Sequence, residues 1–397
     1  EKLVEAILKT GKPHLWRALW LDLLRDVILD TCGMLAKTVH EVSPETYLGL
    51  MSSGPAIHCT EGRDWKKLAE VLGNGKPIYS RPTLWNYNEG ALTGLYDSAR
   101  QIKRTRYVLP KGTIEQTEVE NVPFTAFAKS SSFTALQILL SVAHGCDGAT
   151  LNLFDHMGTT MTIDPDVVEM LASHRKLVEA LAESHCPPGI FKGVRILHNE
   201  RASYLRELGD KDTYFDLEPR DYAYEYALNA LGITTTYNDS PVIAADGQMI
   251  ASYSDDEIKE MLKNGLLLDL RAAESLINRG FGKYLGFSIK ETMLLHEKLT
   301  VSAEELTDAD FGGAPSRYLT MTIPDLVTDA RFGILEPAKS AKQISRLVNP
   351  DRETLCGFTT LFENELGGRV AIIPLDMGKA VSPGFLHPYR REQLVAI

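Results

Sequence analysis

Two glutamates, Glu118 and Glu120, stand two residues apart in the run TEVENVP, which closes a stretch of strand-like composition. Side chains two apart on a β-strand share a face. Both carboxylates are therefore expected on one side with Gln116, whereas Thr117 and Val119 face surrounding helices. Burying two carboxylates is costly unless they are paired or functional. The pattern indicates either an active-site pair or a charged strand end in solvent, and the sequence leaves both interpretations open.

Paired carboxylates are the groups that cleave glycosidic bonds. One acts as nucleophile or base, and the second acts as acid from the other side of the scissile bond. Neighbours on one strand cannot straddle a sugar in this way. One of Glu118 and Glu120 would therefore be the nucleophile, the other would hold a sugar hydroxyl or an arginine, and the acid must come from another strand.

Further candidate binding residues follow neighbouring strand-like runs at the point where each run ends. The carboxyl ends of barrel strands meet at one face, so polar groups there converge on one pocket. Arg81 could hold a carboxylate or the substrate, and Trp85 with Tyr87 could stack on a sugar face; a surface arginine and simple packing are the alternatives. The other candidate substrate-binding residues are Asn121, Asn152, Asp155 and His156.

The first 190 residues alternate helix-like and strand-like segments, which predicts an α/β domain with parallel strands. Strand-like runs cover 46–53, 77–82, 113–120 and 149–155. Four β/α units make half of a (β/α)8 TIM barrel, and we assign residues 1–188 to the C-terminal half of such a barrel. The native chain is expected to start upstream of Glu1.

Two accessory domains are predicted after the linker CPPG at 186–189. Residues 191–300 again alternate strands and helices and form a small doubly wound α/β domain. From 301 to 397 short β-type runs dominate, which favours a small β-sandwich. No G-x-G-x-x-G follows the first strand of the second domain, so a dinucleotide site is not expected there.

Composition excludes several classes of protein. The 397 residues carry a formal net charge of −11 without a Lys/Arg-rich block, which argues against nucleic-acid binding. No apolar run approaches the ~20 residues of a membrane span. Five scattered cysteines, none in a CxxC pair, favour free thiols in a reducing compartment over a metal site or a disulfide framework. We expect no cofactor and no metal, and the location stays open between cytoplasm and periplasm.

The run TEVENVPFTAFAKSSSFTALQILLSVAHGCDGATLNLFDHMG resembles the seventh and eighth strands of clan-A glycoside hydrolases. It is most similar to family 42 β-galactosidases and family 164 β-mannosidase-type enzymes. In that clan the seventh strand ends in the nucleophilic glutamate, a proline often follows, and a helix ending in A-H-G-x-D precedes strand eight. Residues 143–148, AHGCDG, match that helix end.

The resemblance implies a retaining β-glycosidase acting on an oligosaccharide or glycoside. Proline spacing favours Glu120 as nucleophile and the strand register favours Glu118, so both stay candidates. The clan places its acid/base on strand four, usually as Asn-Glu, and no Asn-Glu lies on a barrel strand here; the acid/base is expected outside this chain. Family 42 enzymes follow the barrel with a flavodoxin-like trimerisation domain and a small β domain, so the resemblance also implies a homotrimer formed through 191–300.

Two functions of other classes remain as alternatives. One is a non-catalytic carbohydrate-binding or assembly protein derived from such an enzyme, which the missing acid favours. The other is a lyase or aldolase of the same fold class, in which Lys129 or Lys111 would form a Schiff base. Sugar binding without turnover would indicate the first, and borohydride trapping of a carbonyl substrate would indicate the second.

Overall fold

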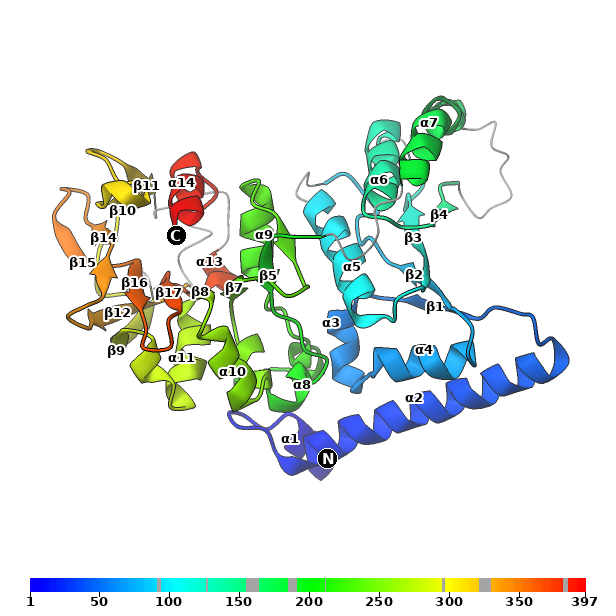
Figure 1. Ribbon diagram of the computed structural model, residues 1–397, viewed down its shortest axis with the longest axis horizontal. Helices are drawn as coiled ribbons and strands as arrows, with labels where there is room; N and C mark the ends of the chain where they lie inside the picture. Colours follow the sequence, from blue (N-terminus) through cyan, green and yellow to red (C-terminus); the bar gives the residue numbers. More distant parts are fainter. Residues whose placement is uncertain are drawn as a thin grey trace. The chain divides into compact units, whose positions relative to one another are not determined.

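The computed structural model forms two compact units, which Figure 1 shows coloured along the chain. Unit 1 consists of Glu1–Ile7 and His14–Phe191, and unit 2 of Leu8–Pro13 and Lys192–Ile397. The structure describes the following residues: 1–90, 94–125, 128–154, 164–184, 191–210, 212–294, 297–320, 330–380 and 385–397.

Unit 1 contains a four-stranded sheet in the order β1-β2-β3-β4, in which every neighbouring pair is parallel. The chain is therefore mixed α/β with a parallel sheet, as the alternating pattern predicts. In the described residues this sheet has two free edges, β1 and β4, and is not closed into a barrel. The strands are β1 (Gly49–Ser52), β2 (Tyr79–Pro82), β3 (Ile114–Glu120) and β4 (Gly148–Asn152).

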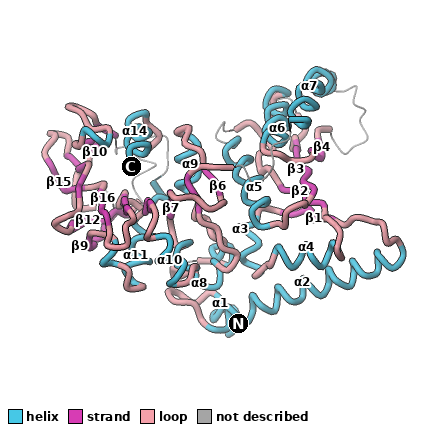
Figure 2. Tube along the Cα trace, in the orientation of Figure 1, coloured by secondary structure: helices cyan, strands magenta, loops and turns pink. Residues whose placement is uncertain are grey.

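Helices connect these strands, and polar side chains cap the first turn of several of them. The Asp64 carboxylate accepts the N–H of Lys67 at 2.9 Å and begins α4, and the Ser130 hydroxyl accepts the N–H of Phe133 at 3.1 Å and begins α6. Figure 2 shows the long α2, which contacts α4. The helices are α1 (Lys2–Ile7), α2 (Leu15–Val42), α3 (Pro55–His58), α4 (Trp65–Gly73), α5 (Gly94–Val108), α6 (Ser131–Ala143) and α7 (Pro165–Ser184).

Unit 2 is built on a seven-stranded sheet in the order β13-β16-β17-β8-β7-β5-β6. The five strands from β17 to β6 are parallel, and β16 and β13 extend the sheet in antiparallel fashion. In chain order the parallel strands run 2-1-3-4-5, one of the common doubly wound orders. They are β5 (Val194–Ile196), β6 (Thr235–Thr236), β7 (Val242–Ala245), β8 (Gly265–Leu268) and β17 (Arg369–Ile372), joined by β13 (Lys342–Gln343) and β16 (Thr360–Glu363).

The structure differs from the predicted division at residue 300. Strand β17 pairs with β8, so residues assigned to a separate β-sandwich complete the sheet of the preceding domain. Val370, Ala371, Ile372 and Ile373 are all buried. A strand buried on both faces shows a continuous apolar run instead of alternation, and this run is the signal that the β-sandwich interpretation overlooked.

The remaining strands of unit 2 form smaller antiparallel sheets. One has the order β11-β10-β14-β15, and the other pairs β12 with β9. Their strands are β9 (Phe287–Leu294), β10 (Ala303–Leu306), β11 (Tyr318–Thr320), β12 (Arg331–Pro337), β14 (Ser345–Val348) and β15 (Thr354–Gly357). The helices of the unit are α8 (Ala202–Leu205), α9 (Ala223–Ala230), α10 (Asp255–Met261), α11 (Leu270–Asn278), α13 (Met377–Ala380) and α14 (Pro388–Ala396), with short 3-10 turns between them.

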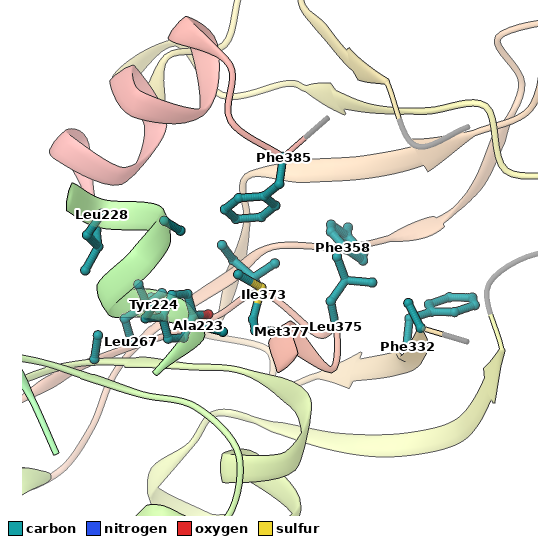
Figure 3. Packing of buried hydrophobic residues seen from close by; sticks show 14 of the residues in the cluster. Ala223, Tyr224, Leu228, Leu267, Phe332, Phe358, Ile373, Leu375, Met377 and Phe385 are labelled. Atoms are coloured by element: carbon teal, nitrogen blue, oxygen red, sulfur yellow. The ribbon is translucent and has the colours of Figure 1, made fainter. Parts of the chain in front are cut away.

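One hydrophobic cluster joins the early and late parts of unit 2, as the close view in Figure 3 shows. Tyr224 of α9 and Leu267 of β8 belong to the same cluster as Phe358, Ile373 and Phe385. A buried ion pair between Glu304 of β10 and Arg390 of α14 holds the last helix against the small sheet. Residues before and after 300 therefore share one core.

Candidate active site

The carboxylate of Glu118, near the carboxyl end of β3, is held by two side chains from the region of β2. The Arg81 guanidinium lies 2.6 Å from one carboxylate oxygen. The hydroxyl of Tyr87 donates to the other at 3.1 Å, and it also lies 3.1 Å from the Thr83 hydroxyl. Glu118 is 8% exposed. The site thus contains a nearly buried carboxylate whose charge is compensated by an arginine and whose two oxygens are both oriented.

Strand register explains why these residues meet. Tyr79 of β2 pairs with Ile114 of β3, and a parallel bridge joins Thr83 to Glu118. Arg81 lies between those two levels, on the same face as Glu118 because side chains alternate along each strand. Its long side chain covers the remaining distance to the carboxylate. The predicted partnership of Arg81 with a strand-end carboxylate is therefore present in the structure.

Glu120 has a different set of partners. The Asn152 amide donates to its carboxylate at 2.5 Å, and the two residues are direct register partners of β3 and β4. The Lys129 ammonium donates to the backbone oxygen of Glu120 at 2.8 Å. Burial lowers the pKa of Lys129 to about 8, against the opposing effect of the Glu120 and Glu89 carboxylates. A second carboxylate therefore lies two residues from Glu118 on the same strand, and an amine with a lowered pKa adjoins this second residue, Glu120.

The two faces of β3 carry different chemistry, as the alternation predicts. The Thr117 hydroxyl donates to Ser141 of α6 at 2.8 Å, and Val119 is fully buried in a cluster that includes residues of α6. Glu118 and Glu120 face away from that helix layer. The sequence prediction for the two sides of this strand is confirmed.

The other predicted binding residues have mixed positions. Trp85 is 49% exposed and adopts a left-handed backbone conformation with φ of 64°, which is unusual for a bulky residue and is found most often at turns or functional sites. Asn121 is buried and accepts a hydrogen bond from Thr134 of α6 at 3.3 Å, so its amide oxygen faces the helix layer and not the Glu118 pair. Asp155 and His156 lie outside the described residues.

Sequence reasoning missed a third acid on the same strand. Glu115 is buried on the opposite face of β3, 3.0 Å from the Arg106 guanidinium of α5. Burial raises its pKa to about 8; Arg106 lowers the pKa, and Asp147 raises it. The Asp147 carboxylate also accepts the Glu115 backbone N–H at 2.8 Å. Because Glu115 lies three residues from Glu118, an odd number, its side chain faces the helix layer and does not belong to the site.

The AHGCDG run has structural contacts in this fold. The backbone oxygen of His144 accepts a hydrogen bond from the Arg106 side chain at 3.1 Å. The His144 ring stacks on the Phe191 ring, with 5.7 Å between the two centroids. Cys146 is buried, and burial raises the pKa of its thiol. Where the structure describes the chain, Cys32, Cys59, Cys146 and Cys356 form no disulfide.

Two properties of the described residues bear on metal binding and on membrane insertion. Where the structure describes the chain, no three His, Cys, Asp or Glu side chains gather in a way that could hold a metal ion. Across the same residues, no helix combines the length and the apolar character that a bilayer span requires.

Comparison with models of known protein families and with curated protein sequences finds no match to this chain.

Proposed function

We propose that unit 1 carries the nucleophile of a retaining glycosidase that acts on β-linked sugars. The observation that supports this most directly is the Glu118 carboxylate, held by Arg81 and Tyr87 near the carboxyl end of a parallel strand. One oxygen of Glu118 would attack the anomeric carbon as the glycosidic C–O bond breaks, and the leaving oxygen would take a proton from an acid on another strand. Water would then release the sugar from Glu118.

The contacts favour Glu118 over Glu120 as the nucleophile. Arg81 and Tyr87 fix both oxygens of Glu118, which keeps the attacking atom in one position and compensates its charge before reaction. Glu120 is bound by a neutral amide, that of Asn152. In this proposal Glu120 and Asn152 orient a sugar hydroxyl, and the exposed ring of Trp85 stacks against a sugar face.

We further propose that the four parallel β/α units are the C-terminal half of a (β/α)8 barrel of the clan-A type. The order β1-β2-β3-β4, with free edges at β1 and β4, supports this. So do the exposed apolar side chains of α2, which lie four residues apart and are unusual for a solvated helix face: Leu15, Leu19, Leu23 and Val27. The strand order of unit 2 supports a flavodoxin-like accessory domain, and homotrimer formation through it remains part of the proposal.

The proposal is tested by replacing Glu118 and Glu120 separately with glutamine in the complete protein. We expect Glu118→Gln to lose hydrolysis of aryl β-glycosides, and Glu118→Gly to regain turnover when azide is added as an external nucleophile. Glu70→Gln, on the exposed face of α4, is the matched control. Wild-type turnover in both glutamine variants would exclude the mechanism. Sugar binding without turnover in the wild-type protein would favour the non-catalytic alternative.

Lys129 provides a specific reason to keep a second function in view. A buried amine with a pKa of about 8 is more often neutral than an ordinary lysine and can attack a carbonyl carbon, with loss of water, to form an imine. Irreversible labelling of Lys129 by borohydride with a carbonyl substrate would support a lyase or aldolase. Absence of label, with aryl glycoside turnover intact, would leave the glycosidase proposal alone.

A further inference from the structure

A large cavity of about 1090 Å³ lies at the carboxyl ends of the parallel strands of unit 2. Segments that follow four of the five parallel strands contribute to its lining, at Leu205 of α8, Gln248, Arg271 of α11 and Asp376. In open doubly wound sheets the crevice outside the carboxyl ends of the strands is where ligands bind. The size is also that of a pocket for a small molecule.

One face of α11 forms a wall of this cavity. Its lining residues, at positions i, i+3, i+4 and i+7, are Arg271, Glu274, Ser275 and Asn278. The opposite face of the helix is buried in the core through Leu270, Ala272, Ala273 and Leu276. The helix therefore presents polar groups to the cavity along more than one turn.

Two guanidinium groups on the wall keep hydrogen-bonding capacity. Arg331 pairs with Glu274 at 2.7 Å through one nitrogen. The nearest described carboxylate oxygen to Arg271 belongs to Asp376 and lies 3.6 Å from its Nε, beyond hydrogen-bond length. Arginine presents five N–H donors in a planar fork that matches carboxylate and phosphate oxygens. Both side chains can therefore bind an anion without breaking a close ion pair.

An ion pair and hydrogen bonds support the inner part of the cavity. Arg206, which also lines it, pairs with the buried carboxylate of Asp221 at 2.9 Å. Gly247 turns the chain there with φ of 65°, and a Cβ at this position would collide with Asp221. The Gly247 N–H donates to Asp269 at 3.1 Å. Such support keeps the lining side chains in place before any ligand arrives.

The lining indicates recognition by charge. Among the described lining residues Tyr253 alone is aromatic, and its hydroxyl already donates to the His198 backbone at 2.9 Å. A neutral sugar would find little ring surface on which to stack. Arg271 and Arg331 suit an oxyanion, and Asp376 and Glu274 can accept hydrogen bonds from hydroxyl groups. We propose that this cavity binds a small polyhydroxylated molecule that carries one carboxylate or phosphate group.

The test uses three matched probes in titration calorimetry with the whole chain: glucose, glucuronate and glucose 6-phosphate. We expect both anionic probes to bind and glucose to bind at least tenfold more weakly. If only glucuronate binds, the cavity recognises a carboxylate. If only glucose 6-phosphate binds, it recognises a phosphate. Absence of binding by either anion at ~10 mM, the weak end for a single small-molecule site, overturns the proposal.

Variants locate the binding. Arg271→Met and Arg331→Met should each lower the affinity for the anionic probes by about tenfold, because one charge-assisted contact is lost. Arg369→Met is the matched control because Arg369 begins β17, at the opposite end of the same sheet, and pairs with an exposed glutamate. Thermal unfolding of each variant checks that it is folded. Equal affinity in both Arg271→Met and Arg331→Met would place the probe elsewhere and reject the site.

Discussion

The two parallel sheets of this protein use carboxylates at their carboxyl ends in different ways. In unit 1, Glu118 is bound by the side chains Arg81 and Tyr87. In unit 2, Asp269 is fully buried and accepts the backbone N–H groups of Ala272, Gly247 and Met377 at 2.7, 3.1 and 3.3 Å. The Glu118 carboxylate is oriented by side chains, whereas the Asp269 carboxylate joins three segments of the main chain.

This difference provides a criterion for assigning a role to an acid at a strand end. Backbone donors belong to the main chain, so an acid that satisfies them stabilises helix starts and turns. Side-chain donors do not fix the chain in this way, so an acid that collects them is a better candidate for chemistry when, unlike Glu115, it faces away from the helix layer. By this criterion Glu118 is the better candidate for chemistry, and Asp269 belongs to the scaffold.

Glu118→Gln is the strongest test of this comparison. We expect aryl β-glycoside turnover to fall by at least about 1000-fold, since the nucleophile is lost, with a change in the free energy of unfolding below about 1 kcal/mol. Initial rates and urea unfolding measure the two quantities. A large loss of stability with retained specific activity would assign Glu118 to the scaffold instead.

The converse change is Asp269→Ala. It removes the N-cap of α11 and leaves buried N–H groups without their acceptor, so we expect unfolding to become easier by about 3 kcal/mol. Chemical denaturation of unit 2 measures the effect. A loss below about 0.5 kcal/mol, the range of ordinary surface changes, would contradict a scaffold role.

A smaller effect is expected from Tyr87→Phe. It deletes one hydrogen bond to Glu118 and leaves the ring in place, so kcat should fall by about tenfold, the value of one such bond at a reacting carboxylate. Tyr107→Phe, a partly exposed tyrosine of α5, serves as the control. An unchanged kcat in Tyr87→Phe would separate this hydroxyl from the chemistry.

The last expected effect concerns pH. Burial, and then the Asp221 carboxylate, raises the pKa of Asp246 in unit 2 to about 7, above the ~3.9 of an unfolded chain. The folded state therefore binds this proton more tightly. The stability that it contributes is complete below about pH 4 and is lost as the pH rises toward 7.

Asp246→Asn, which cannot titrate, should flatten that dependence by at least about 1 kcal/mol between pH 4 and 7. Urea unfolding at a series of pH values measures it. If the free energy of unfolding depended on pH equally in the wild-type protein and in Asp246→Asn, the Asp246 carboxyl would not be protonated in the folded state.

Several features of the fold and the site were predictable from local patterns. The alternation of strand-like and helix-like segments predicted parallel β/α organisation, and the two-residue period of TEVENVP predicted that Glu118 and Glu120 share a face while Val119 meets the helices. The strand-like run predicted at 113–120 is β3, Ile114–Glu120. These features depend on backbone geometry within a few residues, which is why a single sequence was enough.

The features that could not be predicted from the sequence depend on contacts between residues far apart in the chain. Arg81 meets Glu118 because β2 and β3 are registered neighbours, Tyr87 donates to that carboxylate where a stacking role was expected, and β17 joins β8 across the predicted boundary at 300. Local composition does not specify strand neighbours or register, because these are set by which hydrophobic faces bury one another over long sequence separations. For this protein the sequence determined which residue types lie on each face, and packing determined which of them meet.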